Sequence, residues 1–434
     1  MLSRKTKTKT KTKTKTKTKT KTKTKTKTKT KTKTKTKTKT KTKTKTKTKY
    51  YYLIKNNYIP DNTVKQIMKK RQIWEEYDLD NPQTDIIDFI YLDKYFNYQK
   101  KFWGLKSKIN GQLDISGTKI NQTDKYNIIN NLTKLNDPKL NKMLLEQHKV
   151  NLLLIYKKEV MIEKYKKLFN NNKVWIFKFI YGSLGENIIV LDSYKKFKKF
   201  VFKTINQQKN NWNKINHKNY NSLGKKIKTK YFIDWVLQEY IINPMLYEDK
   251  KFHLRGYFVY SYDKLKNKKE GYFLDDNRVF TAKLPFKQGD YSNKQIHDSH
   301  YDSTPSEINY KPNIINLLGR KQTIRIDNQL KYLYKSIFKI LDLKCYKNDD
   351  ICFNIFGSDI MITDDYQIKF IELNEKPGLP TYMDSKKLNA MVLFKKVLDK
   401  IVDKRYPPLL NKKSKKSKKS KKSKKLEQPQ LIKL

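Results

Sequence analysis

Asp359, Glu372 and Asn374 contribute two carboxylates and one amide to the stretch Cys352–Asn374, which is rich in apolar residues on both sides of a polar turn. Oxygen donors of these types are the ligands that Mg²⁺ prefers, usually together with the phosphates of a nucleotide. A single acidic residue would favour a solvated strand face, but the three together favour a metal site. We therefore predict that these three side chains bind Mg²⁺.

A β-hairpin must position these side chains. Residues 352–362 and 367–374 are rich in β-forming apolar residues and flank the polar turn 363–366. If the turn is centred between Asp364 and Asp365, Asp359 pairs with Phe370 and Glu372 is its diagonal neighbour, roughly 7–8 Å away. Asn374 follows on the same face because side chains alternate along a strand. The opposite, core-facing side is predicted to carry Ile360, Ile362, Ile371 and Leu373.

A lysine inside an apolar run is a second candidate. Residues 174–180 read as a buried strand that holds Lys178, and residues 188–191 read as the returning strand. A buried ammonium is costly unless an anion meets it, which favours phosphate binding, although the side chain could instead extend to solvent. Gly185, in the turn between the strands, allows the backbone to approach a phosphate closely.

Further candidates lie downstream. Arg255, in the strand predicted for residues 252–260, can bind a carboxylate or phosphate through two hydrogen bonds, with a surface salt bridge as the alternative. His297 and His300 lie in the aperiodic stretch 283–312, which we interpret as a long loop near a site. Ordinary loop histidines are the equal alternative.

The ordered set of motifs resembles the tubulin-tyrosine-ligase-like family of ATP-grasp ligases. Gly-x-Asp ending at Asp359 and Glu-x-Asn beginning at Glu372, followed by Pro377, are similar to the metal-binding end of these enzymes. Trp175-Ile-Phe-Lys178 resembles their Trp-Ile-x-Lys strand, whose lysine contacts an ATP phosphate.

Other segments continue the resemblance in the same order. Gln238-Glu239-Tyr240-Ile241, ahead of Pro244, resembles the Gln-x-Tyr-Ile hinge that brackets adenine. Lys251-Phe-His-Leu-Arg255 is similar to the family's Lys-Phe-Asp-x-Arg, and residues 297–300 stand where the family has His-Leu-Thr-Asn. Lys125 corresponds to the ATP-binding lysine of the N-terminal lobe.

The chain also departs from the family pattern. Phe179, Leu184 and Asn187 replace a Pro, an Arg and a Gly, and His253 replaces an Asp. An arginine that the family places near the amino-acid substrate falls on Phe280, with Arg278 two residues away. These departures leave the metal hairpin intact, but they leave open the substrate and the possibility of an inactive nucleotide-binding protein.

The resemblance implies an α+β or α/β ATP-grasp fold. It has an N-terminal α/β lobe (50–168), a small central lobe (169–242) and a larger C-terminal lobe (243–408), between disordered tails (1–49 and 409–434). It implies catalytic roles for Arg255 and Glu372. The residues expected to bind ATP are Lys125, Lys178, Gly185, Gln238, Glu239, Tyr240 and Ile241. Those expected to bind the substrate are Lys251, Arg278, His297 and His300.

The resemblance further implies an ATP- and Mg²⁺-dependent ligase that forms a peptide or isopeptide bond through an acylphosphate. Its acceptor would be a carboxylate in an acidic polypeptide such as a tubulin C-terminal tail. Three alternatives remain: a ligase that acts on another protein or on a small acid, a degenerate ATP-binding protein, and a polyanion-binding protein.

Charge and composition bear on the partner. Lys and Thr alternate from Lys5 to Lys49, and Lys-Lys-Ser repeats from Lys412 to Lys425. Neither repeat has an apolar residue to bury, so both tails are predicted to be disordered. Of the net charge of +58, residues 1–49 hold +24, residues 412–434 hold +10 and the core holds +24. This excess favours an acidic polypeptide, nucleic acid or another polyanion. For the core, a coding bias towards Lys, Asn, Ile and Tyr is an equal alternative.

Localisation follows from what the sequence lacks. The two cysteines, Cys345 and Cys352, make a disulfide framework implausible and fit a reducing compartment. No apolar run reaches membrane-spanning length, and no apolar segment of a secretory signal follows the basic N-terminus. We therefore expect an intracellular protein, cytoplasmic rather than secreted.

Overall fold

The computed structural model describes residues 49–54, 59–91, 104–111, 122–170, 173–182, 188–213, 232–297, 308–375, 377, 390–407 and 429–434. All of them belong to one compact unit, Lys47–Leu434. The Lys-Thr tail, most of the Lys-Lys-Ser tail, Gly185 and His300 lie outside the described residues.

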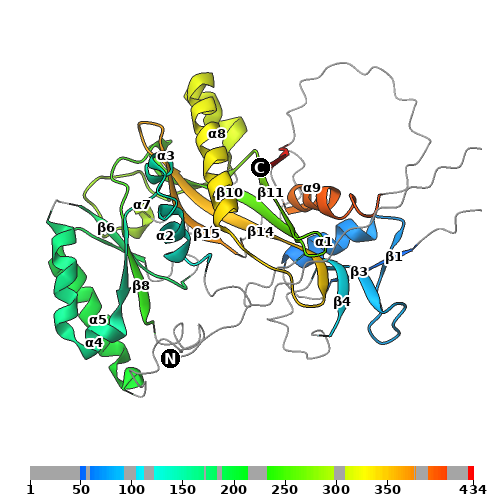
Figure 1. Ribbon diagram of the computed structural model, residues 1–434. Coiled ribbons are helices and arrows are strands. Elements are labelled where there is room, and N and C mark those ends of the chain that lie inside the picture. The colour runs from blue at the N-terminus through cyan, green and yellow to red at the C-terminus, as the bar shows by residue number, and fades with distance from the viewer. Residues whose placement is uncertain are drawn as a thin grey trace, which may run out of the picture. The chain divides into compact units, whose positions relative to one another are not determined.

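The larger sheet joins strands from both ends of the described chain (Figure 1). Its strands, in spatial order, are β13 (Ile308–Asn309), β12 (Arg278–Thr281), β10 (Lys250–Asp263), β14 (Asp349–Ile362), β4 (Lys106–Asn110), β3 (Ile86–Tyr91), β1 (Tyr50–Ile54) and β2 (Trp74–Glu76). Four strands pair off this path, namely β9 (Leu246–Tyr247) and β11 (Lys268–Leu274) on β10, β15 (Ile368–Asn374) on β14, and β16 (Leu431–Lys433) on β11.

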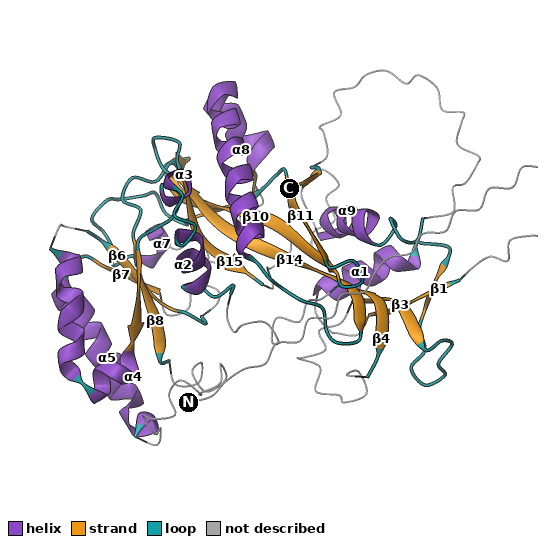
Figure 2. Ribbon diagram, viewed as in Figure 1, coloured by secondary structure: helices purple, strands orange, loops and turns teal. Residues whose placement is uncertain are grey.

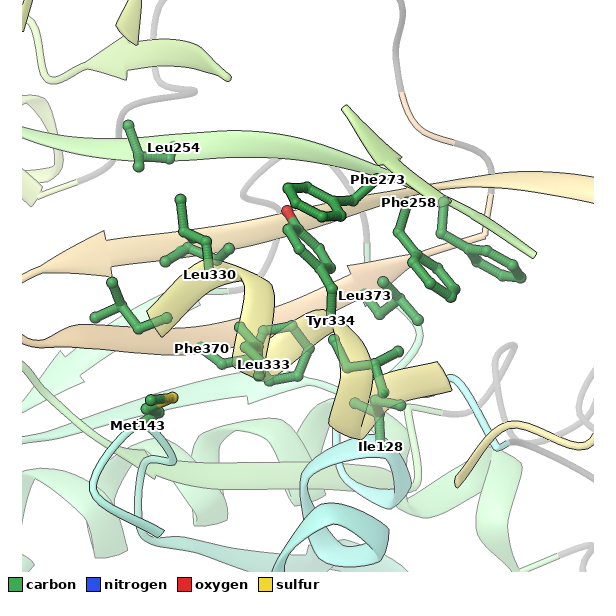
Figure 3. Packing of buried hydrophobic residues seen from close by; sticks show 14 of the residues in the cluster. Ile128, Met143, Leu254, Phe258, Phe273, Leu330, Leu333, Tyr334, Phe370 and Leu373 are labelled. Carbon is green, nitrogen blue, oxygen red and sulfur yellow. The ribbon is translucent and has the colours of Figure 1, made fainter. Parts of the chain in front are cut away.

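The long strands β10 and β14 pair antiparallel from Leu254 opposite Ile360 to Asp263 opposite Ile351. Successive side chains of a strand point to opposite faces, so these two strands serve two cores. Phe258 and Phe356 belong to the core under α8 (Ile315–Ile340), α2 (Asn127–Thr133) and α3 (Pro138–Asn141), part of which is drawn in Figure 3.

Val259 and Phe353 belong to the second core, on the opposite face of β10 and β14. It is covered by α1 (Ile59–Lys69) and α9 (Ala390–Ile401), which lie side by side although they come from opposite ends of the chain (Figure 2). Two short helical elements, α7 (Lys294–His297) and η4 (Tyr310–Ile314), flank β13 in the chain. No helix in the described part of the chain is both long enough and apolar enough to cross a bilayer.

The smaller sheet has the order β5 (Gln147–Asn151), β8 (Asp234–Glu239), β6 (Trp175–Phe179) and β7 (Ile188–Leu191). Its strands β6 and β7 confirm the predicted strand pair, and Trp175, Phe177 and Trp235 are buried in its core. This core is shared with α4 (Leu152–Lys157), the 3₁₀ helix η2 (Glu159–Phe169) and α5 (Tyr194–Trp212). The sheet draws residues from both sides of the boundary predicted at 168–169; the domain limits themselves stay a prediction.

Two expectations about the end of the chain and about its cysteines are wrong. Leu431–Lys433, predicted to belong to a disordered tail, form β16 because Leu431 is buried against the second core. Cys345 and Cys352 are joined by a disulfide. The chain turns back between α8 and β14, which brings their Cα atoms to 5.4 Å, within the usual range for a disulfide.

The side chains packed around β10, above all Tyr334 of α8, predict a requirement for glycine at position 256. A Cβ atom there would overlap the hydroxyl oxygen of Tyr334 and lie 2.7 Å from the side-chain oxygens of Asn277 and Ser358. We expect Gly256→Ala to lower the free energy of unfolding by about 1–3 kcal/mol. At Gly104 nothing lies within 4 Å, so Gly104→Ala should change it by less than about 0.5 kcal/mol. Urea unfolding of the two variants tests this, and equal losses would contradict it.

Candidate active site

The hairpin β14–β15 is confirmed, but its register differs from the predicted one. Ile360 pairs with Phe370, and a bulge then shifts the register so that Asp359 lies directly opposite Glu372. We had predicted Asp359 opposite Phe370 and Glu372 on the diagonal. A bulge inserts one extra residue into one strand, and here it brings the two carboxylates onto directly paired positions.

The bulge also moves Ile371 away from its predicted place. Phe370 and Leu373 belong to the core beneath α8, whereas Ile371 packs against the small cluster of Leu145, Ile241 and Met361. Two consecutive residues, Ile371 and Glu372, therefore leave the core face, which a regular strand does not allow. The prediction that Ile371 faces the core with Leu373 is wrong for this reason.

Asp359 is held by a buried arginine from the neighbouring strand. Arg255 lies opposite Asp359 in the β10–β14 register and donates from both Nε and Nη2, the latter 3.0 Å from Oδ2. Asn374 donates from Nδ2 to the same Oδ2 at 3.1 Å. Burial alone would lower the pKa of Arg255, but the Asp359 carboxylate outweighs this effect and raises that pKa above its ordinary value, so the guanidinium is charged.

Glu372 is met by two lysines. Its Oε2 lies 3.4 Å from Nζ of Lys178 and 3.8 Å from Nζ of Lys125. Burial tends to raise the pKa of Glu372, but Lys125, Lys178 and Arg255 together lower it to about 2. Lys178 is only 3% exposed, which excludes the alternative that its ammonium reaches solvent.

This ion pair connects the two sheets. Lys178 belongs to β6 of the smaller sheet, whereas Glu372 belongs to β15 of the larger one. Burial lowers the pKa of Lys178 and nearby Lys125 adds to that effect, while Glu372 opposes it. A buried ammonium that shares one carboxylate with a second ammonium is suited to receive a further anion.

A second group of predicted residues gathers at residues 238–241. Nζ of Lys251 lies 3.8 Å from the centre of the Tyr240 ring, and the Tyr240 hydroxyl lies 2.7 Å from Nδ1 of His297. Burial lowers the pKa of Lys251 to about 7. Gln238 donates to the carbonyl of Ile371 at 3.4 Å, and its buried Oε1 has no hydrogen-bond partner among the described residues. A bound group with a donor would satisfy that oxygen.

The remaining residues of this segment have structural partners. Glu239 accepts a hydrogen bond from the backbone nitrogen of Glu146 at 3.3 Å. Ile241 packs in the cluster with Leu145 and Met361. The backbone nitrogen of Glu239 also has a structural partner, since it donates to the carbonyl of Glu146 at 2.8 Å.

Arg278 flanks the site from β12, where it lies opposite Arg255. It is 6% exposed, and among the described residues no carboxylate lies within ion-pair distance of it. Its guanidinium lies 4.9 Å from the centre of the Phe280 ring, on which His253 stacks at 5.0 Å. A buried guanidinium that meets no carboxylate in the described part of the chain is suited to bind a substrate anion.

The structure thus gathers Lys125, Lys178, Arg255, Asp359, Glu372 and Asn374 into one charged group. Sequence reasoning missed Thr123, whose hydroxyl donates to the carboxylate of Glu375 and so ties the Lys125 segment to the end of β15. The only signal for Thr123 was its place two residues before Lys125.

The donors in this group fit a magnesium ion in part. Among the described residues, no set of three or more Asp, Glu, His or Cys side chains is arranged to hold a metal. Asp359 and Glu372 nevertheless supply two adjacent carboxylates, and Asn374 donates through its nitrogen and keeps its oxygen as a possible ligand. Such an incomplete shell fits Mg²⁺ that also binds nucleotide phosphates.

The small antiparallel sheet presents the buried Lys178 to Glu372 of the larger sheet, and the two sheets together form an ATP-grasp fold. The fold is similar to the crystal structure of the C-terminal domain of *K. lactis* Pby1, described as an ATP-grasp enzyme that interacts with the mRNA decapping enzyme Dcp2. The TM-score is 0.53 at 17% identity, covering 86% of this chain and 99% of that chain.

The family follows from the sequence match. The model of the tubulin-tyrosine ligase family matches residues 116–415, and the chain belongs to that family. No curated protein sequence matches the chain. Family and fold together support an ATP-dependent ligase.

Burial of Lys251 predicts a pH dependence of stability. Its folded pKa, about 7, lies below the ordinary value of 10.5, so the unfolded chain binds more protons between these values. The contribution of Lys251 to stability therefore rises with pH through this window and is constant below it. We expect the free energy of unfolding of Lys251→Met, measured with urea, to exceed that of the wild type most at about pH 7. The difference should be smaller at about pH 9.5.

The matched control for this prediction is Lys250→Met, at the neighbouring, half-exposed position. Its difference from the wild type should not change with pH. If Lys251→Met raised the free energy of unfolding by the same amount at both pH values, the prediction would be contradicted.

Proposed function

We propose that this chain is a carboxylate–amine ligase that uses ATP to join an amino acid to a carboxylate in an acidic protein tail. The observation that carries the proposal is the contact of Glu372 with both Lys178 and Lys125, directly opposite the Asp359–Arg255 pair. Two anionic and three cationic side chains in one buried place suit the transfer of a phosphoryl group.

The cationic and the anionic side chains of the site would bind different parts of the reactants. Lys178 and Lys125 would bind and orient the ATP phosphates, and residues 238–241 with Lys251 would hold the base. Asp359, Glu372 and Asn374 would hold Mg²⁺, which when bound supplies charge neutralisation at the phosphates. Arg255, fixed by Asp359, would orient the acceptor carboxylate, and Arg278 would bind the carboxylate of the incoming amino acid.

The reaction balances without a further reactant. An oxygen of the acceptor carboxylate attacks the γ-phosphorus, the bond from that phosphorus to the β–γ bridging oxygen breaks, and ADP leaves. The amine nitrogen then attacks the acyl carbon of the acylphosphate. The bond from that carbon to the phosphate oxygen breaks, phosphate leaves and the amine loses a proton to form the amide.

The acceptor is proposed from charge. The core alone carries +24, which would attract an acidic polypeptide such as a tubulin C-terminal tail over a long range. The tails, with +24 and +10, would add nonspecific affinity for nucleic acid or other polyanions. A ligase for a small acid is the second candidate, favoured by the replacement of family residues at His253 and Phe280.

The role of Glu372 gives the first activity prediction. We expect Glu372→Gln to lower ATP turnover by at least about 100-fold, because one anionic ligand and the partner of Lys178 are lost together. Glu159→Gln, an exposed site on η2, is the matched control and should leave turnover unchanged. Near-UV circular dichroism checks that both variants fold. A folded Glu372→Gln variant with wild-type turnover would refute the site assignment.

The acceptor gives the second activity prediction. ATP consumption is measured with an acidic tail peptide, its fully amidated counterpart and free glutamate. We expect turnover on the acidic peptide alone, with a rate at low peptide concentration that falls several-fold between about 50 and 300 mM salt. Equal, salt-independent turnover on glutamate would favour the small-acid ligase. Absence of turnover on all three would favour a degenerate or polyanion-binding protein.

A further inference from the structure

Strand β16 lies at the edge of the larger sheet, beside β11 (Figure 1). The register is antiparallel and places Leu431 opposite Leu274 and Lys433 opposite Tyr272. The other neighbour of β11 is β10. If β16 were removed, the outer edge of β11 would present unpaired backbone groups, which is the usual template for adding a strand.

Backbone hydrogen bonds extend the pairing at both ends of β16. The nitrogen of Leu434 donates to the carbonyl of Gly271 at 3.0 Å. At the other end, the nitrogen of Asp275 donates to the carbonyl of Gln430 at 2.9 Å, and the nitrogen of Gln430 donates to the Asp275 carboxylate. The segment 430–434 is thus bound through its main chain along its whole length.

Alternate side chains of this segment are bound on opposite faces of the sheet. Leu431, 8% exposed, packs in the second core with Tyr272 and Leu274. Ile432 and Leu434 pack against the core beneath α8. Gly271 leaves room for Leu434, since a Cβ there would lie 3.1 Å from Cδ1 of Leu434 and 2.7 Å from the ring of Phe338.

Lys433 is bound by a specific carboxylate. Its Nζ lies 2.8 Å from Oε1 of Glu270. The Tyr272 hydroxyl donates to Oε2 of Glu270 at 2.9 Å, and Lys404 lies 3.6 Å from the same oxygen. Burial tends to raise the pKa of Glu270, but Lys433, Tyr272 and Lys404 lower it to about 2, so the carboxylate is charged at neutral pH.

The path of the chain separates this segment from the rest of the core. Lys404, just after α9, and Lys433 both reach Glu270, so the chain returns close to where it left. Between them, residues 411–425 contain only Asn, Lys and Ser. The apolar residues of 431–434 therefore belong to a separate short strand, β16, rather than to a continuation of α9.

We propose that the edge of β11 is a peptide-binding site for an extended segment of the pattern apolar–apolar–lysine–apolar, and that residues 431–434 of the same chain are its built-in ligand. Main-chain pairing supplies the general affinity, and Glu270 and the two apolar faces supply the specificity. The site is independent of the ligase chemistry proposed above, because none of its residues belongs to the charged group around Glu372.

The first test uses hydrogen exchange on the full chain. In Lys433→Glu, we expect exchange of residues 271–275 and 430–434 to rise at least about tenfold, while exchange of β14 stays unchanged. The control Lys433→Arg keeps the positive charge opposite Glu270 and should leave exchange of both segments unchanged. Faster exchange of β14 as well would show an integral strand and overturn the proposal, as would unchanged exchange in Lys433→Glu.

The second test uses a labelled peptide, Pro-Gln-Leu-Ile-Lys-Leu, that matches residues 429–434. We expect it to bind Lys433→Glu at least about tenfold more tightly than the wild type, whose own segment competes for the edge. It should not bind the double variant Glu270→Lys/Lys433→Glu, in which the lysine at position 270, together with Lys268 and Lys404, repels the lysine of the peptide. Equal binding to all three proteins, or to none, would overturn the proposal.

The two sources of the segment are separated by dilution. Protection of residues 271–275 should not depend on protein concentration if the same chain supplies the strand. Protection that falls on dilution would show that a second copy supplies it and would overturn the assignment to the same chain.

Discussion

A buried charge that must find a partner governs this structure. Lys178 lies in the smaller sheet, almost without solvent, and Glu372 in the larger sheet is its nearest carboxylate. Breaking a buried pair of this kind typically costs about 3–5 kcal/mol, because one charge is left without compensation. The two sheets are therefore held to each other at the place where the chemistry is proposed. Lys125, shared with the same carboxylate, adds a third segment of the chain to that point.

The second constraint is the pairing of β10 with β14. These strands bring Arg255 opposite Asp359, and their alternating side chains fill a core on each face. A rotation or slip by one residue would move every one of those side chains to the wrong face. The rigid apolar packing around the charged group is what keeps its geometry fixed, and a preorganised group of charges is what phosphoryl transfer needs.

The edges of the larger sheet are treated differently from its centre. The outer edge of β11 is covered by β16, which follows a lysine- and serine-rich stretch of the chain. Glu270, the ion-pair partner of Lys433 in β16, also pairs with Lys404 next to α9. The predicted catalytic residues Arg255 and Glu372 lie on β10 and β15, within the residues that match the family model. The residues that hold β16 against β11 have no predicted catalytic role.

Local patterns in the sequence were sufficient for the hairpin, for the strands at residues 175–179 and 188–191 and for most of the charged residues, because strand periodicity and the cost of burying a charge act over short distances. Three features depended on how the folded chain packs: the bulge that pairs Asp359 with Glu372, the disulfide between Cys345 and Cys352, and the strand at 431–433. A bulge is chosen by what each face packs against, a disulfide by whether the folded backbone brings two cysteines within reach, and an edge strand by the partner that it covers. The residue types in a local window do not fix these outcomes, even for two cysteines seven residues apart, so only the tertiary structure decides them.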